Sequence, residues 1–291
     1  MNQIRFLVSP GRRVAMLLLT YVVGLVVTSF VSSLLMNIGG EGKHVAMMRI
    51  AVVVQDIFMM IVPAVVTALI VTRQPVRLLA IGTAPTGRQT LLAVLVMLVS
   101  SPLMSWIIKL NASVHLPESM AALEASLRAM EDAAEATVQL MLGGHTPANL
   151  LLNILLIGVL AGFSEELFFR GAMQRLLGTT RMSQTAAIWI TAIVFSAVHF
   201  QFFGFVPRLL LGAYFGYLLV WSGSLWLPIL IHTLNNSLFV VLQHFTGSGE
   251  PQFGASADGT AGVIISAVLT VAGLYLLYRQ RTTTLNPKNG N

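Results

Sequence analysis

Residues 161–170 read Ala-Gly-Phe-Ser-Glu-Glu-Leu-Phe-Phe-Arg, and this stretch decides how the chain must fold. It ends an apolar run that begins near Leu150, so Glu165 and Glu166 lie inside a hydrophobic segment. A charge at mid-bilayer costs about 3 kcal/mol or more, so each carboxylate needs a partner, a proton or a use. On a helix, Glu166 and Arg170 share a face and can form an ion pair. Glu165 is rotated away by about 100°, and we expect it to face a water molecule.

The composition indicates a polytopic membrane protein. The chain has 291 residues, of which 56% are hydrophobic and 10% charged, and its mean hydropathy is +0.81. Soluble domains carry about 25% charged residues. The length suits a single membrane domain, residues 1–291, without a large soluble appendage. Cysteine is absent, which excludes disulfides, thiolate catalysis and Cys-ligated metals. The net charge of +6 comes from basic loops, so we expect no nucleic-acid partner.

Eight apolar runs have about the length of 20 residues that spans a bilayer. They cover residues 14–36, 48–72, 90–109, 149–177, 184–203, 206–222, 225–245 and 261–279. The first run follows three arginines, as a signal peptide would, but it has no small-residue cleavage site, so we expect a retained span. The prediction is an all-α fold with about eight transmembrane helices embedded in the lipid bilayer.

The segment 112–145 separates the third run from the fourth and should lie outside the membrane. Within it, residues 117–142 repeat apolar side chains at three- and four-residue steps, which is the pattern of an amphipathic helix. The apolar side chains are Met120, Leu123, Leu127, Met130 and Ala134. Its many charges make it too polar to span, so we place it at the extracytoplasmic membrane surface.

Loop charges predict the orientation of the chain. With the N-terminus in the cytoplasm, the inside segments hold twelve basic residues, Arg170 and Arg175 among them, and no loop acid. The outside segments hold five basic residues, including Arg208, and eight acids. This asymmetry follows the positive-inside rule and predicts that both termini are cytoplasmic. The short chain and its loops suggest a bacterial cytoplasmic membrane.

Acids and histidines inside spans are functional candidates because burying them in lipid is costly. They are Asp56, Glu165, Glu166, His199 and His232. A helical rise of 1.5 Å per residue puts Glu165 roughly 20 Å and His199 roughly 22 Å from the cytoplasmic ends of their helices. His232 and Asn236 lie roughly 10 to 17 Å deep and share a helix face. These levels are similar enough for the side chains to meet. For Asp56 we favour a buried structural hydrogen bond over a role in the site.

Such a cluster suits hydrolysis of a peptide bond. A carboxylate and a histidine can take a proton from water and make it a nucleophile. A second histidine and an asparagine amide can donate hydrogen bonds to an oxyanion. Glu165, His199 and His232 could also bind zinc, because carboxylate and imidazole are ordinary ligands and a catalytic site needs three. The sequence lacks the His-Glu-x-x-His signature of zinc proteases and offers no serine or cysteine nucleophile motif in a span.

Three ordered motifs in the spans resemble those of a known family. They are Glu165-Glu166-x-x-x-Arg170, Phe195-x-x-x-His199 and His232-x-x-x-Asn236. The chain thereby resembles the CPBP intramembrane proteases, also called the Abi or CAAX-protease-like family, which include the type II CAAX prenyl endopeptidases. The resemblance covers residues 150–241, within a catalytic core that we place at residues 149–245. The first three spans show no matching motif.

The resemblance implies an eight-helix membrane fold with the site inside the bilayer. It implies that Glu165 and His199 activate the water, and that His232 and Asn236 form the oxyanion site. Supporting roles would fall to Glu166, Arg170 and Phe195. Family members are commonly called metalloproteases, yet a metal-free glutamate mechanism has also been put forward for them. Zinc and a metal-free site therefore both stay open.

The implied substrate is a membrane-associated protein or peptide, processed in CAAX-type or bacteriocin-related chemistry. Two other classes of function stay open. One is a non-catalytic membrane scaffold or immunity protein of the same fold. The other is a proton-coupled transporter that uses Glu165 and His199 as a relay, although no internal repeat typical of transporters is visible.

Two further patterns are typical of packing features. Gly212-x-x-x-Gly216 predicts a face for close helix packing. Four phenylalanines near Pro207 predict an anchor at the outer membrane interface, with a lateral entry for substrate as the alternative. They are Phe200, Phe202, Phe203 and Phe205.

Overall fold

The computed structural model describes residues 4–39, 44–144, 146–247 and 259–281. In these ranges the regular structure is helical, with one isolated bridge of extended backbone between Phe6 and Thr72. Some charges that predict the orientation lie outside the described residues, as does the last residue of the surface segment. They are Glu41, Lys43, Glu250, Asp258 and Lys288, together with His145.

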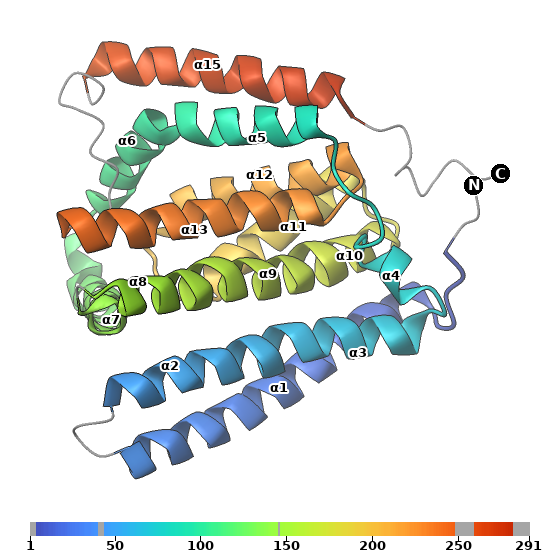
Figure 1. The fold of residues 1–291 in the computed structure, drawn as a ribbon, viewed down its shortest axis with the longest axis horizontal. Helices are drawn as coiled ribbons and strands as arrows, with labels where there is room; N and C mark the ends of the chain where they lie inside the picture. Colours follow the sequence, from blue (N-terminus) through green and yellow to red (C-terminus); the bar gives the residue numbers. More distant parts are fainter. Residues whose placement is uncertain (1–3, 40–43, 145, 248–258, 282–291) are drawn as a thin grey trace.

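The helices form three groups of rods that lie side by side (Figure 1). The first group contains α1 (Pro10–Gly39), α2 (His44–Gln55), the π-helix η2 (Asp56–Ile61) and α3 (Val62–Val71). The central group contains α8 (Pro147–Asn153), η4 (Ile154–Leu160), α9 (Ala161–Glu166), η5 (Leu167–Gln174), α10 (Arg175–Gly178), α11 (Gln184–Ala197), α12 (Phe205–Ser222) and α13 (Trp226–Thr246). The third group contains α5 (Gly87–Val99), α6 (Ser101–Ala112) and α15 (Thr260–Arg279). The connecting helices are α4 (Pro75–Leu78), η3 (Glu118–Met120) and α7 (Ala121–Leu142).

Five helical segments of the described chain are long and apolar enough to cross a membrane. They are Pro10–Ile38, His44–Val71, Pro147–Gly178, Phe205–Ser222 and Thr260–Arg279. A sixth is added when α5 and α6 count as one span despite a bend of 47° between them. Pro102 lies in the first turn of α6 and cannot donate a helical N–H, which explains the bend. The membrane class is confirmed with five or six candidate spans, while the total of eight and the orientation stay predictions.

The helix predicted for the fifth apolar run, residues 184–203, is wrong in its length. Helix α11 has 14 residues and ends at Ala197. The next three residues form a turn in which the amides of His199 and Phe200 bond to carbonyls three residues earlier. Phe200 then takes a left-handed φ of 54°, which a continuing helix cannot contain. His199 therefore lies just beyond the helix rather than inside it.

Glu165 and Glu166 lie on a short helix between two π-helical segments. Helix α9 carries Glu165 and Glu166, with η4 before it and η5 after it. The third π-segment, η2, begins at Asp56 and also contacts α9. Single-turn π-bulges are rare and frequently occur at functional sites, because the wider turn redirects the side chains around it. The sequence contained no signal that predicted these segments.

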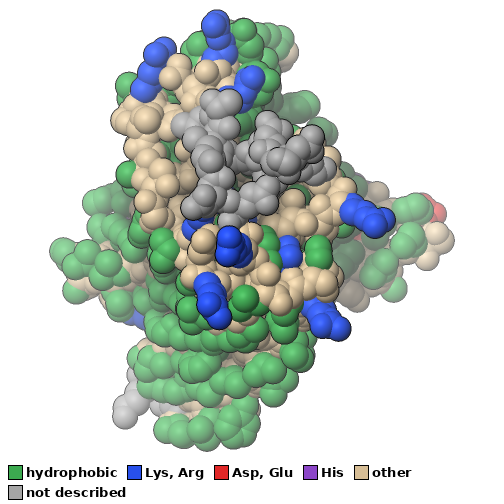
Figure 2. Space-filling view, turned by 90° about the vertical axis from the view of Figure 1, so that its right-hand side faces the viewer, with side chains coloured by type: hydrophobic (Ala, Val, Ile, Leu, Met, Phe, Trp, Pro, Cys, Tyr) green, Lys and Arg blue, Asp and Glu red, His purple; other side chains and the backbone are tan. Residues whose placement is uncertain are grey.

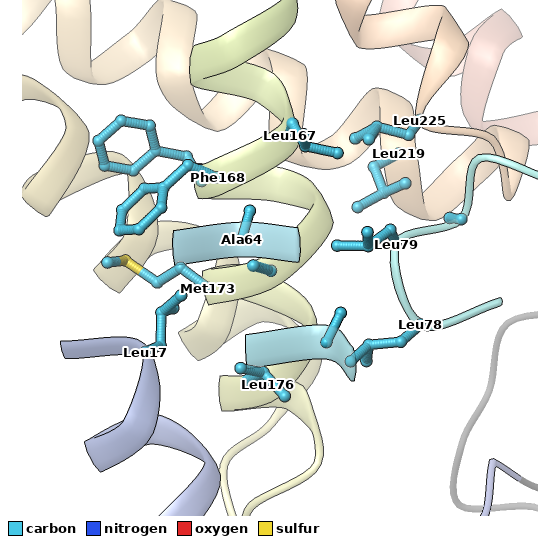
Figure 3. Close-up of a cluster of buried hydrophobic side chains, with 14 of the residues drawn as sticks. Leu17, Ala64, Leu78, Leu79, Leu167, Phe168, Met173, Leu176, Leu219 and Leu225 are labelled. Atoms are coloured by element: carbon cyan, nitrogen blue, oxygen red, sulfur yellow. The ribbon is translucent and has the colours of Figure 1, made fainter. Parts of the chain in front are cut away.

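The largest cluster of buried apolar side chains surrounds η5 (Figure 3). All eight residues of η5 are buried. Leu17 of α1, Ala64 of α3 and Leu78 of α4 pack against this segment. Lipid tails are as apolar as leucine, so close packing rather than exclusion of water holds such a cluster within a membrane. This buried cluster thus fixes the position of the helix that carries Glu165 and Glu166.

Small residues bring the central helices close together. The predicted Gly212/Gly216 face is confirmed, because the Gly212 carbonyl accepts from Arg170 Nη2 at 3.0 Å and the Gly216 carbonyl accepts from Gln174 Nε2 at 3.1 Å. A second close contact was not predicted. At Gly162, a Cβ would lie 2.9 Å from the backbone nitrogen of Thr233 on α13. Any larger residue there would push α9 away from α13.

The predicted amphipathic helix is present as η3 and α7. Its apolar side chains stay largely exposed, with Leu123 and Met130 both nearly half accessible. Figure 2 shows basic side chains spread over one end of the molecule, a clustering of the kind that the positive-inside rule describes.

Two charges used in that rule are not loop charges. Arg170 is fully buried, and Arg208 is partly buried in the first turn of α12. Neither can therefore contribute to the orientation as a loop residue would.

Candidate active site

A buried network joins α9, η5 and α13. Arg170 Nη1 donates to Glu166 Oε1 at 2.7 Å, and both side chains have no exposed surface. The Nδ1 atom of His232 lies 2.8 Å from the same carboxylate oxygen. Glu166 Oε1 accepts from Arg170, and as an acceptor in the second contact too it takes a hydrogen from His232 Nδ1. The predicted ion pair is therefore present, and it also orients the histidine.

Aromatic rings enclose this network. The Arg170 guanidinium carbon lies 4.4 Å from the ring centre of Phe195, and Phe215 and Phe169 are also near it. Phe215 stacks on the His232 ring at 4.7 Å. A guanidinium over aromatic faces gains cation–π attraction, which is stronger where water is excluded. The sequence pattern did not reveal the role of Phe215.

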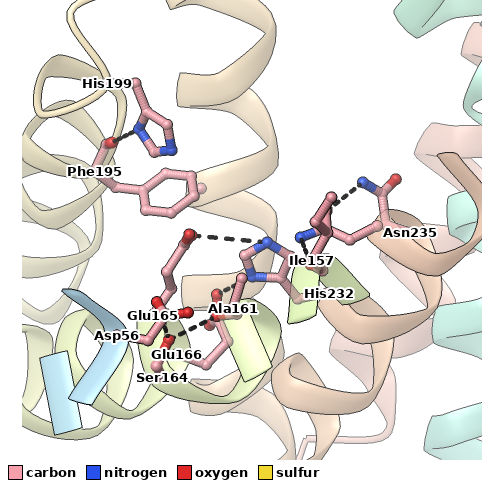
Figure 4. A network of polar contacts seen from close by, with 12 residues as sticks. Asp56, Ile157, Ala161, Ser164, Glu165, Glu166, Phe195, His199, His232 and Asn235 are labelled. Carbon is pink, nitrogen blue, oxygen red and sulfur yellow. Dashed lines mark hydrogen bonds and ion pairs between the residues drawn. The ribbon is translucent and has the colours of Figure 1, made fainter. Parts of the chain in front are cut away.

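Glu165 points away from the ion pair, as its rotation on the helix predicts. Its side chain is 19% exposed, and its Oε2 lies 3.8 Å from His232 Nε2 (Figure 4). This separation is longer than a hydrogen bond. His232 thus holds Glu166 with one ring nitrogen and presents the other to Glu165. The two adjacent acids have different environments, one enclosed and one open.

His199 reaches the same region from the turn after α11. Its Nδ1 lies 2.7 Å from the carbonyl oxygen of Phe195. A carbonyl only accepts, so Nδ1 carries the hydrogen and Nε2 of the neutral ring keeps a lone pair. The Phe195 ring contacts His199 at 5.2 Å and His232 at 6.1 Å between ring centres. One phenylalanine therefore sets the positions of both histidines.

Asn236 was predicted to donate a hydrogen bond to an oxyanion, and in the structure its amide donates to a backbone carbonyl. Its Nδ2 donates to the carbonyl of Ile157 at 3.2 Å, within the π-segment η4. Asn235 Nδ2 lies 3.4 Å from Asn236 Oδ1. One N–H of the Asn236 amide is thus used to attach α13 to η4, and the other is left for a further acceptor.

Asp56 joins the network from the first group of helices. Its Oδ1 accepts from Ser164 Oγ at 2.9 Å, and both residues are buried. The structural hydrogen bond that we favoured is present. The Asp56 Oδ2 atom is buried without a hydrogen-bond partner, and Figure 4 shows the side chain beside Glu165. The predicted residues from α9, α13 and the α11–α12 turn therefore meet, and Asp56 meets them from the first group.

The donors suit zinc by type but not by position. Across the part of the chain that the structure describes, no group of three or more His, Cys, Asp or Glu side chains is placed to hold a metal ion. His232 Nδ1 is already engaged by Glu166. Zinc at Glu165, His199 and His232 stays a prediction.

Comparison with known families agrees with the motif pattern. Residues 147–238 match the model of the Rce1-like type II CAAX prenyl endopeptidases. The predicted resemblance is therefore confirmed over this segment, whose match to the Rce1-like model is consistent with the CPBP family. The matched segment contains all three motifs, from Glu165 to Asn236.

One curated relative matches a similar length of chain. It is the uncharacterized protein YpbD of Bacillus subtilis (strain 168), which is 25% identical over 91 residues. The match covers 30% of this chain and 43% of the relative, so the chain spans less than half the length of the relative it matches. No solved structure matches.

Proposed function

We propose that this protein is an intramembrane endopeptidase that hydrolyses a peptide bond in a membrane-associated protein or peptide. The observation that carries the proposal is that two adjacent acids have different environments. Glu166 is paired with Arg170 and His232, whereas Glu165 is open and faces the free side of His232. If the two acids served only to stabilise the fold, we would expect both carboxylates to be paired. The Rce1-like domain supports the same chemistry, since its family is a protease family.

The first step uses Glu165 as a general base. Its carboxylate takes a proton from a water molecule while the water oxygen forms a bond to the peptide carbonyl carbon. The electron pair of the carbonyl bond moves onto the oxygen. His199 Nε2, which has a lone pair, accepts the second hydrogen bond of the water and orients it. When the tetrahedral intermediate collapses, the C–N bond breaks and Glu165 returns the proton to the leaving nitrogen.

The oxyanion is stabilised by His232. In this scheme both ring nitrogens of His232 carry a hydrogen: Nδ1 donates to Glu166, and Nε2 donates to the oxyanion. Removing a single oxyanion donor typically costs about 100- to 1,000-fold in rate. The remaining N–H of Asn236 supplies a second donor. In this scheme Glu166, Arg170 and Phe195 position the reacting groups without touching the substrate.

The finer topology belongs to the same proposal. Eight helices cross the membrane, with both termini in the cytoplasm and α7 on the extracytoplasmic surface. Support comes from the basic face in Figure 2 and from the positive-inside pattern. We place the enzyme in a bacterial cytoplasmic membrane. Its proposed substrates are of the CAAX type or are related to bacteriocins.

The decisive experiment compares membrane-associated peptides in cells that carry wild-type or Glu165→Gln protein. Peptides produced only by the wild type are the expected result. With a peptide so identified, purified Glu165→Gln and His199→Ala should lose activity by about 100- to 10,000-fold while they stay folded. Variants that keep the full cellular phenotype would instead indicate a scaffold. Loss of substrate-dependent proton flux in proteoliposomes, without cleavage, would indicate a transporter.

The metal is tested separately on the purified protein. If Glu165 acts directly on water, a chelator should leave cleavage of that peptide unchanged. Loss of activity that returns on addition of zinc would assign a metal to Glu165, His199 and His232. Zinc binding should then also disappear in His199→Ala, as measured by metal analysis of the protein.

A further inference from the structure

Arg208 lies next to the proposed site and forms no ion pair with a carboxylate of the described residues. It is in the first turn of α12, directly after the turn that contains His199. Its Nη2 donates to the side-chain oxygen of Gln201, which directly follows that turn. Its Nη1 is buried and has no hydrogen-bond partner. Leaving a charged nitrogen unsatisfied is costly, so this arrangement needs an explanation.

The guanidinium interacts electrostatically with the reacting groups. Arg208 lies close enough to Glu165, Glu131 and His199 to interact with them electrostatically. The ion pairs among the described residues do not include Arg208 with either carboxylate. Glu131 of α7 accepts with its Oε2 from the amide of Phe203 at 3.2 Å.

The buried Arg170 shows what a structural arginine looks like in this protein. Arg170 donates to Glu166 at 2.7 Å and to the Gly212 carbonyl at 3.0 Å. Arg208 is held by a neutral amide only, which leaves its charge uncompensated at hydrogen-bond distance. A neutral partner fixes the position of the guanidinium without using up its affinity for an anion.

We propose that Arg208 binds a carboxylate of the substrate and so determines which peptide bond is placed at Glu165. This inference rests on the proposed peptidase function and adds a substrate property to it. Arg208 Nη1 provides a charge-assisted hydrogen bond to the carboxylate, which is shorter and stronger than a neutral one. The carboxylate belongs either to the C-terminus of the substrate or to an Asp or Glu side chain near the cleaved bond.

The test uses purified protein in detergent with three pools of random decapeptides. One pool has free C-termini and no Asp or Glu, the second has amidated C-termini with Asp and Glu, and the third has no carboxylate. Mass spectrometry measures the cleavage rate in each pool. The wild type should cleave at least one carboxylate pool about 10- to 100-fold faster than the third, the range expected for one charged hydrogen bond. The preferred pool identifies the source of the carboxylate.

Variants separate recognition from structure. Arg208→Gln should bring the ratio between the pools close to one, whereas Arg208→Lys should retain part of the preference. Arg88→Gln removes the same charge from an exposed position on α5 and should leave the ratio as in the wild type. A merely structural role would lower cleavage of all pools equally and leave the ratio unchanged in Arg208→Gln.

The outcomes also separate the two proposals. Cleavage that depends on Glu165 but shows no carboxylate preference overturns the role of Arg208 and leaves the peptidase proposal intact. If no pool is cleaved faster by the wild type than by Glu165→Gln, the peptidase proposal is contradicted and the inference is lost with it.

Discussion

The same three residue types form an ion network twice in this molecule, once in the core and once on the surface. In the core, Glu166 is paired with Arg170 four residues later and contacts His232. On α7, Glu124 is paired with Arg128 four residues later and contacts His115. The first network has almost no exposed surface. In the second, His115 is 77% and Arg128 is 36% exposed.

The difference shows that spacing decides which charges pair, while the surroundings decide what the pair does. Exposed ion pairs contribute little because water and salt screen them. The buried network is different, since removing one partner leaves an uncompensated charge where water is excluded. It also holds His232 in one orientation. The proposed site requires this orientation, whereas the surface network has no such requirement for His115. The surface network attaches α7 to the segment before it through the amide of Leu116.

The largest effect is expected from Arg170→Met. Glu166 would lose its cation, and breaking a buried pair on one side typically costs about 3–5 kcal/mol. The thermal unfolding midpoint in detergent should fall strongly, or the protein should fail to accumulate. The double variant Arg170→Met with Glu166→Gln removes both charges and should recover part of that stability. Equal unfolding of the single and double variants would contradict a charge-based cause.

A smaller loss of stability is expected from His232→Gln. The substitution removes the charge-assisted contact with Glu166, and such hydrogen bonds contribute about 1.5–3 kcal/mol. The Glu166–Arg170 pair stays, so the protein should still fold, whereas cleavage of the substrate peptide should be lost. His115→Gln is the matched surface control and should change neither property. Full activity in folded His232→Gln would remove His232 from the mechanism.

Arg128→Met should have little effect on global stability. It breaks the surface counterpart of the Arg170 pair and the contact with the Phe203 ring, which lies 3.9 Å from the Arg128 guanidinium carbon. We expect no resolved change in the unfolding midpoint and faster hydrogen exchange only in the α11–α12 turn. A destabilisation as large as that of Arg170→Met would show that burial is not what separates the two networks.

The smallest effect concerns pH. The amide of Leu116, followed by Arg128 and His115, lowers the pKa of Glu124 to about 2. A carboxylate with a lowered pKa stabilises the fold above its ordinary pKa and loses that contribution as the pH falls through about 2. Protection of the Leu116 amide from hydrogen exchange should therefore be constant well above the ordinary pKa of 4.5 and should fall progressively between that value and about 2. Glu124→Gln should weaken this protection at neutral pH and remove its dependence on pH in this range.

Local spacing was sufficient to predict several features of the site. The four-residue step between Glu166 and Arg170 predicted their ion pair, and the one-residue offset predicted that Glu165 faces elsewhere. The step between Gly212 and Gly216 predicted close packing. Each of these depends on the geometry of a single helix, which sequence position defines. The ordered motifs also predicted the family of residues 147–238.

Other features arise only where different helices meet. Sequence spacing did not show that α11 ends at Ala197, that Asn236 bonds to Ile157, or that Ser164 bonds to Asp56. Arg208 looked like a loop charge, although it lies beside the site with a buried, unpaired nitrogen.

The sequence by itself therefore determined the membrane class, the residues that share a helix face and the chemistry available to them. Tertiary structure alone decided which faces meet, where helices widen and where α11 ends. The physical reason is that one helix fixes directions only about its own axis, whereas contacts between helices depend on packing along the whole chain.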